Sequence, residues 1–336
     1  MGTSPRFFTP GRLFGLAVVA SILTWFMLLI GGTVNPTESS LACKDWAFNA
    51  LGMPLCNGEL FPAMKDGVQF EHGHRLWGWL VGMATVGVAL WALLDKRLPK
   101  ATKWLAVGGV FMVLAQGALG GITVLLQLDP VVSTGHLLLG YTFLSLMIFV
   151  AWRLHPSRRE APSVGARLPR GALGLAIGLI LVQALIGAAM RHLGGGMICG
   201  DDPIACGGLG FWPLMDLGKL HMTHRLFGYL VLVAIIVIAF KARREALAAD
   251  RPKAARLALV PAALVVLQVA LGLITVVTGK AVVIVTLHTA VGGLLMATAV
   301  MLYLSFGPLG DPSADRRRPA DAATPPAPAN RAWEAA

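Results

Sequence analysis

The chain has 336 residues, of which 56% are hydrophobic and only 13% are charged. A soluble domain carries about 25% charged residues, so this composition excludes an ordinary soluble protein and indicates membrane-spanning helices. The net charge of +11 does not indicate a nucleic-acid binder, because the basic residues lie in short loops between apolar runs.

Apolar runs long enough to cross a bilayer recur along the chain and predict an all-α integral membrane protein with eight transmembrane helices. We expect these helices at about 13–32, 73–94, 104–126, 132–152, 171–190, 222–240, 257–278 and 282–304. The first run is too long for the apolar part of a cleavable signal peptide, so we expect it to be retained as a helix. No Arg- and Ser-rich transit segment precedes it, which favours a bacterial plasma (inner) membrane.

The loops differ sharply in basic residues. Twenty-one Lys and Arg residues fall on one side of the predicted spans, and only Lys44, Lys65, Lys219 and Lys280 fall on the other. Because basic loops stay in the cytoplasm, both termini are expected there, and the long loops at about 33–71 and 191–220 are expected outside. The expected organisation is therefore a cytoplasmic N-terminus (1–12), a four-helix unit (13–152), a cytoplasmic linker (153–170), a second four-helix unit (171–305) and a disordered cytoplasmic tail (306–336).

The two predicted units resemble each other in sequence. Segment 74–81 reads HRLWGWLV and matches HRLFGYLV at 224–231, an offset of 150. Segment 116–124 reads QGALGGITV and matches QVALGLITV at 268–276, an offset of 152. The pattern predicts two tandem four-helix bundles related by internal duplication, both inserted in the same orientation.

Four histidines occupy equivalent places in this repeat: His74 and His136 in the first unit, His224 and His288 in the second. Each lies near the outer start of its predicted helix, so each pair is expected at one depth in the bilayer. Two imidazoles at one depth can hold a heme iron from both faces. The alternatives are histidines that only hydrogen-bond to a neighbouring helix, and zinc, which normally needs three or four protein ligands.

Several polar residues near these histidines are further candidates. Glu71 lies one helical turn before His74, where a carboxylate can move a proton or simply favour the helix dipole. Its counterpart at an offset of 150 is His221, so the two units differ at this position. Arg75 and Arg225 follow the two histidines and are candidates for binding heme propionates, or for reaching lipid headgroups.

The remaining histidines of the outer side have no assigned role. His72 lies two residues before His74, on another face of the predicted helix, so both cannot face one cofactor. His221 lies three residues before His224 and can share its face, and His192 lies at an outer helix end where it can line a site.

All four cysteines lie in the outer loops, two in each: Cys43 and Cys56, then Cys199 and Cys206. Paired cysteines in an oxidising compartment predict one disulfide per loop, and a redox-active pair is the alternative. Neither pair is followed by the histidine of a covalent heme attachment motif.

These features together resemble the heme A synthase family over residues of about 10–305. The matching residues are Glu71-His72-Gly73-His74-Arg75, His136, His224-Arg225 and His288, with the two cysteine pairs, Asn35-Pro36-Thr37 and Phe211-Trp212-Pro213-Leu214-Met215. The chain departs from the family in its first loop, where 12 residues separate Cys43 from Cys56 instead of a tight cysteine–tryptophan–proline–cysteine arrangement.

The resemblance implies an oxidoreductase whose substrate is heme O. The C8 methyl would be hydroxylated twice, and the resulting gem-diol would lose water to give the formyl of heme A. The first unit would hold the substrate on His74 and His136 beside the catalytic Glu71, and the second would hold a permanent heme B on His224 and His288. The implied partners are heme O synthase, which supplies the substrate, and the cytochrome oxidase assembly factors that receive the product. Assembly as a homo-oligomer is compatible with the sequence.

Other functions remain open at this stage. A diheme b-type cytochrome that exchanges electrons with quinone explains the four histidines but gives Glu71 no chemical task. A heme transporter or chaperone would bind heme without turnover. A prenyltransferase needs acidic clusters within its helices, and Asp201-Asp202 lies in an outer loop instead.

Overall fold

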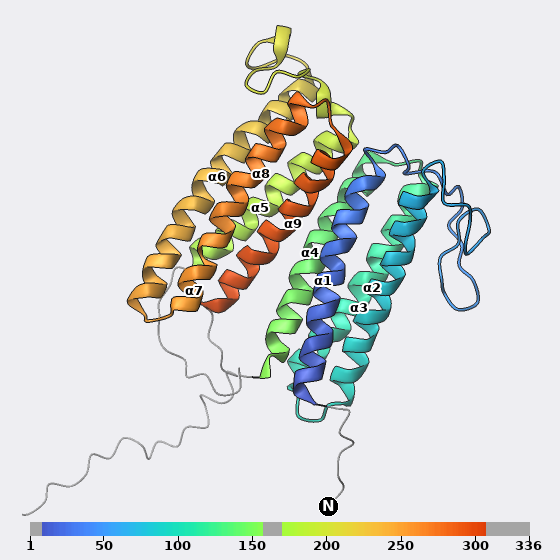
Figure 1. Cartoon of the computed structure of the whole chain (residues 1–336), viewed down its shortest axis with the longest axis vertical. Coiled ribbons are helices and arrows are strands. Elements are labelled where there is room, and N and C mark those ends of the chain that lie inside the picture. The colour runs from blue at the N-terminus through green and yellow to red at the C-terminus, as the bar shows by residue number, and fades with distance from the viewer. Residues whose placement is uncertain (1–8, 157–169, 307–336) are drawn as a thin grey trace, which may run out of the picture.

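The computed structural model describes residues 9–156 and 170–306. Within these residues, eight helices are long and apolar enough to cross a membrane (Figure 1), so the expected all-α, multi-pass membrane class is confirmed. The helices are α1 (Pro10–Val34), α2 (Val68–Leu94), α3 (Lys100–Leu125), α4 (Pro130–Leu154), α5 (Arg170–His192), α6 (Asp216–Ala248), α7 (Pro252–Leu257) with α8 (Leu259–Val277), and α9 (Val282–Ser305). Two short 3₁₀ helices, η2 (Gly195–Met197) and η3 (Gly207–Leu209), lie in the loop between α5 and α6.

Local capping fixes where several helices begin. The Asp129 side chain accepts hydrogen bonds from the backbone N–H groups of Val131 and Val132, and Pro130 occupies the first turn of α4. This is a strong start signal, because it satisfies free N–H groups and uses a residue already set for helical geometry. At α2 the preceding Gly67 has a φ of 90°, which a side chain would oppose. These starts place His74 and His136 each at the seventh residue of its helix.

The structure differs from the expected spans in two places. Helix α6 was expected to end near residue 240 but continues to Ala248, because the sequence KARREALA consists of strong helix formers. The expected span 257–278 corresponds to α8, and the short helix α7 precedes it, separated from it at Ala258. Most of the linker expected at 153–170 and nearly all of the tail expected at 306–336 lie outside the described residues.

The helices form two groups that lie side by side, α1–α4 and α5–α9 (Figure 1). Helices α1 and α4 of the first group pack against α9 of the second, and α4 also packs against α5. A continuous apolar core crosses this boundary and includes Leu28 and Leu144 from the first group with Ile180, Ile235 and Leu295 from the second. The two groups therefore share a core and are held together by van der Waals packing between helices as well as by the chain.

Candidate functional site

The first-group histidines face each other from α2 and α4. The ring centres of His74 and His136 are 6.4 Å apart, and the rings are inclined at 78°. Two iron–imidazole bonds of about 2 Å, with about 1 Å from each nitrogen to its ring centre, give a separation of about 6 Å. The observed spacing fits two axial ligands of one metal.

Each of these histidines packs against a glycine of a neighbouring helix. A Cβ added to Gly31 of α1 would lie 2.8 Å from His74 Nε2, and one added to Gly120 of α3 would lie 3.2 Å from His136 Cε1. A side chain at either position would press on the ring that it faces. The glycines therefore make the room in which the imidazoles lie, a role that the sequence reasoning did not identify.

The second-group histidines line one cavity of about 470 Å³. His224 of α6 and His288 of α9 contribute to its wall, with glycines again beside them: a Cβ on Gly187 would lie 2.6 Å from His224 Cε1, and one on Gly272 would lie 3.3 Å from His288 Cε1. The volume is typical of small-molecule and cofactor sites, about 300–1,000 Å³. The wall is mixed, since aliphatic side chains surround a few polar groups.

Glutamine side chains contact the histidines from adjacent helices. Gln116 Nε2 donates to the backbone oxygen of His136 at 2.8 Å, and Gln183 Nε2 donates to that of His224 at 3.0 Å. Gln183 Nε2 also lies 3.1 Å from His224 Nδ1. The bonds to the two backbone oxygens hold the helix segments that carry His136 and His224. Gln183 of α5 packs against Gly228 of α6. In the first group Met27 of α1 packs against Gly78 of α2 in the same way, so a methionine stands where the second group has a glutamine.

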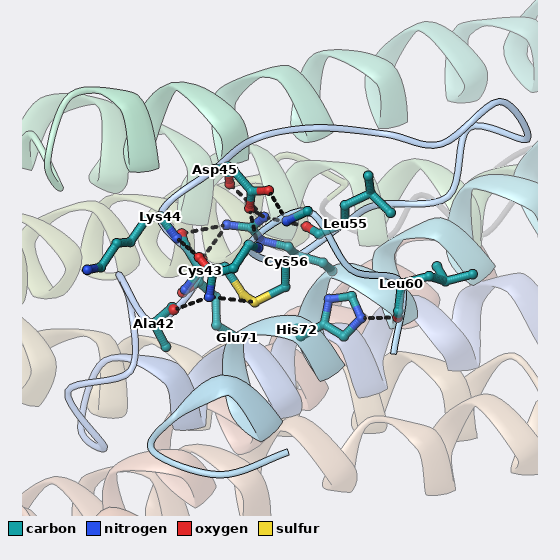
Figure 2. Close-up of a disulfide and its surroundings, with 12 residues drawn as sticks. Ala42, Cys43, Lys44, Asp45, Leu55, Cys56, Leu60, Glu71 and His72 are labelled. Carbon is teal, nitrogen blue, oxygen red and sulfur yellow. Dashed lines mark hydrogen bonds and ion pairs between the residues drawn. A yellow bond between two sulfur atoms is a disulfide. The ribbon is translucent and has the colours of Figure 1, made fainter. Parts of the chain in front are cut away.

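Glu71 lies beneath the first outer loop, close to the first disulfide (Figure 2), and forms a buried ion pair with Arg75. Glu71 Oε1 accepts from Arg75 Nη2 at 2.6 Å, and Oε2 accepts from the backbone N–H of Cys43 at 2.7 Å. Arg75 also donates to three loop carbonyls, those of Cys43, Asp45 and Leu55. The pair thus joins α2 to the loop, and both Nη atoms of Arg75 are used by the protein itself.

Arg225, the counterpart of Arg75, is less fully used. Its Nη1 donates to the backbone oxygen of Ala205 at 2.7 Å. Its Nε and Nη2 are buried and have no hydrogen-bond partner among the described residues, and the side chain lines the second cavity. Among the described residues Arg75 leaves only Nε without a partner, so of the two arginines expected to bind propionates Arg225 has more donors available to a ligand.

Both expected disulfides are formed, between Cys43 and Cys56 and between Cys199 and Cys206. The first loop folds back on itself between its cysteines: Asp45 accepts from the N–H groups of Asn57 and Gly58. This turn accommodates the 12 residues that made the loop depart from the family pattern.

His72 lies beside the first disulfide, where its Nε2 is 2.8 Å from the oxygen of Leu60 (Figure 2). Among the described residues, Cys43, Cys56 and His72 are the only group of three or more side chains of metal-ligand type. Their sulfurs are joined to each other, so they offer no thiolate. Within residues 9–156 and 170–306, neither repeat-related histidine pair gathers a third such ligand, which favours heme over zinc at the pairs.

The other outer groups have structural contacts. His221 Nδ1 lies 2.9 Å from the oxygen of Gly195, and its side chain lines the second cavity together with His224. His192 ends α5 and is half-buried. Asp202 accepts hydrogen bonds from the N–H groups of Ala205 and Ile204, which hold its pKa below the usual value for a carboxyl.

The two sites are joined across the boundary between the groups. The hydroxyl of Tyr141, five residues after His136, donates to the oxygen of Thr289, the residue after His288, at 3.0 Å. Trp25 Nε1 of α1 donates to the neighbouring oxygen of Ala290 at 2.9 Å. Helices α4 and α9, each of which carries one histidine of its site, are therefore held in register.

Comparison with known proteins identifies relatives along most of the chain. Residues 15–300 match the model of the COX15-CtaA family, described as cytochrome oxidase assembly protein. A similar protein named heme A synthase from Symbiobacterium thermophilum is 32% identical over 78% of this chain and 84% of the relative. Another of the same name, from Caulobacter sp. (strain K31), is 27% identical over 84% of this chain and 92% of the relative. A third, from Rhizorhabdus wittichii, is 27% identical over 90% of this chain and 95% of the relative.

Proposed function

The chain belongs to the COX15-CtaA family of cytochrome oxidase assembly proteins, and we propose that it is a heme A synthase that oxidises the C8 methyl of heme O to a formyl. The proposal makes it an oxidoreductase, in agreement with the name carried by its relatives. The observation that carries it is the pair His74 and His136, whose 6.4 Å spacing fits axial ligation of the substrate iron.

The two groups of helices would hold two different hemes. His74 and His136 would bind the substrate heme O, and His224 and His288 would bind a resident heme B in the second cavity. When bound, heme B supplies one-electron oxidation and reduction. Gln183 and Gln268 would lie beside its two ligands, since their amide nitrogens are 3.1 Å from His224 Nδ1 and 3.3 Å from His288 Nε2.

Glu71 would serve the oxidation in the first group. Glu71 precedes His74 by three residues on the same face of α2, so its carboxylate would lie near a heme held there. The hydrogen bonds from Cys43 and Arg75 fix its two oxygens, and the carboxylate would accept a proton released as the methyl is oxidised to an alcohol. His221 occupies the equivalent place in the second group, which is consistent with binding there without turnover.

The setting follows from the charge distribution and the family. The excess of basic residues on one side supports insertion in a bacterial inner membrane with both termini in the cytoplasm. Heme O synthase would deliver the substrate, and cytochrome oxidase assembly factors would take the product. In this arrangement the histidine pairs lie toward the outer side of the membrane.

The test is heme conversion in a membrane that contains heme O but no heme A. Wild-type protein is expected to produce heme A or its hydroxymethyl intermediate, measured by chromatography of extracted hemes. Removal of a general acid or base costs about 10²–10⁴ in rate, so Glu71→Gln is expected to abolish detectable product. The matched control is Glu245→Gln. Glu245 is an exposed glutamate at the end of α6 that lies away from His224, so this variant should retain activity. Protein that carries only heme B and leaves confirmed heme O unchanged would contradict the proposal and favour an electron carrier.

A further inference from the structure

Arg191 stands at the boundary between the two groups of helices. It belongs to the last turn of α5, and its Nε donates to Asn35 Oδ1, the residue that ends α1, at 2.9 Å. Its Nη2 lies 3.4 Å from the oxygen of Gly32, also on α1. The side chain nevertheless lines the second-group cavity with His224 and His288. A cation of the second site is thus held in place by the first group.

The cavity has a surplus of positive charge that its own residues do not neutralise. Three cationic side chains line it, Arg191, Arg225 and Lys280, against one carboxylate, Glu38, a net charge of +2. None of the ion pairs found among the described residues involves Arg191. Buried or half-buried cations normally have an anionic partner. The surplus therefore matches a flat apolar ligand that carries two carboxylates.

Arg191 has the free donors that such a carboxylate needs. Its bonds to α1 use Nε and one hydrogen of Nη2, which leaves Nη1 and the other hydrogen of Nη2. A guanidinium binds a carboxylate through two parallel N–H groups, a geometry that lysine cannot reproduce. An arginine at the end of a membrane helix often reaches out to lipid headgroups. Arg191 does not, because its side chain is directed to Asn35 and Gly32.

We propose that Arg191 binds a propionate carboxylate of the heme in the second cavity, while Asn35 and Gly32 hold its guanidinium in position. This inference rests on the proposed function only in that a heme occupies His224 and His288. It makes Arg191 a ligand-binding residue of the second site whose geometry depends on α1 of the first. Arg225, with Nε and Nη2 unpartnered, is placed to bind the second propionate.

The test compares heme B with its dimethyl ester, in which both carboxylates are blocked. The parent for all variants is the full chain with His74→Ala and His136→Ala, so that only the second histidine pair can ligate iron. Purified protein is titrated with each heme, and binding is followed by the Soret absorbance. The parent is expected to bind heme B more tightly than the ester. Arg191→Gln removes one charge-assisted contact and is expected to weaken heme B binding by about tenfold to a hundredfold, while binding of the ester changes little.

Three further variants make the result specific. Arg191→Lys keeps the positive charge but lacks the paired N–H donors of the guanidinium. Its preference for heme B over the ester is expected to lie between those of the parent and Arg191→Gln. Asn35→Ala releases the guanidinium and is expected to reduce the preference for heme B by a smaller factor. Arg256→Gln, an exposed arginine of α7 far from the cavity, should behave as the parent.

The outcomes separate the inference from the proposed function. An Arg191→Gln protein that keeps the full preference for heme B, or that loses heme B and ester equally, overturns the propionate contact. A wild-type chain that shows the preference but never converts heme O retains the contact and loses the proposed function. Failure of the parent to bind heme B at His224 and His288 overturns both.

Discussion

Glu71 and Arg75 illustrate how strongly one buried pair can constrain this molecule. Their side chains are 5% and 4% exposed, and the Arg75 guanidinium is surrounded by Glu71 and three loop carbonyls. Charges taken out of water are tolerated only when each is well paired and hydrogen-bonded. The carboxylate proposed for catalysis therefore depends on Arg75 for its position, and the outer loop depends on both.

Arg75→Ala is expected to be strongly destabilising, because it leaves the Glu71 carboxylate buried without its partner. Breaking such a pair costs about 3–5 kcal/mol, so the first outer loop should detach, become sensitive to protease and lose heme conversion. The matched control is Lys219→Ala: Lys219 pairs with Asp216, both side chains are exposed, at 42% and 98%, and an exposed pair contributes about 0–1 kcal/mol. Thermal unfolding and limited proteolysis of both proteins measure the difference. Equal losses in the two variants would contradict a special role for the buried pair.

Among the helices, the contact of each site histidine with a glycine sets how closely neighbouring helices approach. Four different helices supply these glycines, α1, α3, α5 and α8, and each faces a histidine of an adjacent helix. Small residues allow helices in membranes to pack closely. Here the space gained is occupied by an imidazole ring, so helix spacing and ligand position are set by the same contact.

Gly187→Ala is expected to displace His224, because the new Cβ would lie 2.6 Å from the ring. Overpacking of this kind costs about 1–3 kcal/mol, and the heme proposed for the second site should be lost or show altered absorption and EPR spectra. Gly178→Ala on the same helix is the control, since a Cβ there meets nothing within 4 Å and alanine favours helix. Normal heme spectra in Gly187→Ala would mean that the glycine does not set the ligand position.

At the scale of the whole molecule, the spans and the grouping of histidines could be predicted because they depend on local sequence. Apolar run length locates the helices, and the histidines fall on helices that all enter from one side. The partners of Arg75 could not be predicted, since its bonds reach residues 20 to 32 positions earlier across a loop of irregular backbone. The glycine–histidine contacts and the position of Arg191 also required knowledge of which helices are neighbours. The length of α6 was missed because hydropathy does not detect a helix that continues as polar residues.

The matched depth of the two sites has an electrical consequence. His74, His136 and His288 are each the seventh residue of their helices and His224 is the ninth, and these helices all begin at the same face of the bundle (Figure 1). Two residues of helix correspond to about 3 Å, so an electron passing between the proposed hemes would travel along the plane of the membrane. A full crossing would couple to the membrane voltage by about 2.3 kcal/mol per 100 mV, whereas this path crosses almost none of it. In proteoliposomes, the rate of electron exchange between the two hemes is therefore expected to stay constant when a potassium diffusion potential is imposed, and a rate that followed the voltage would place the hemes at different depths.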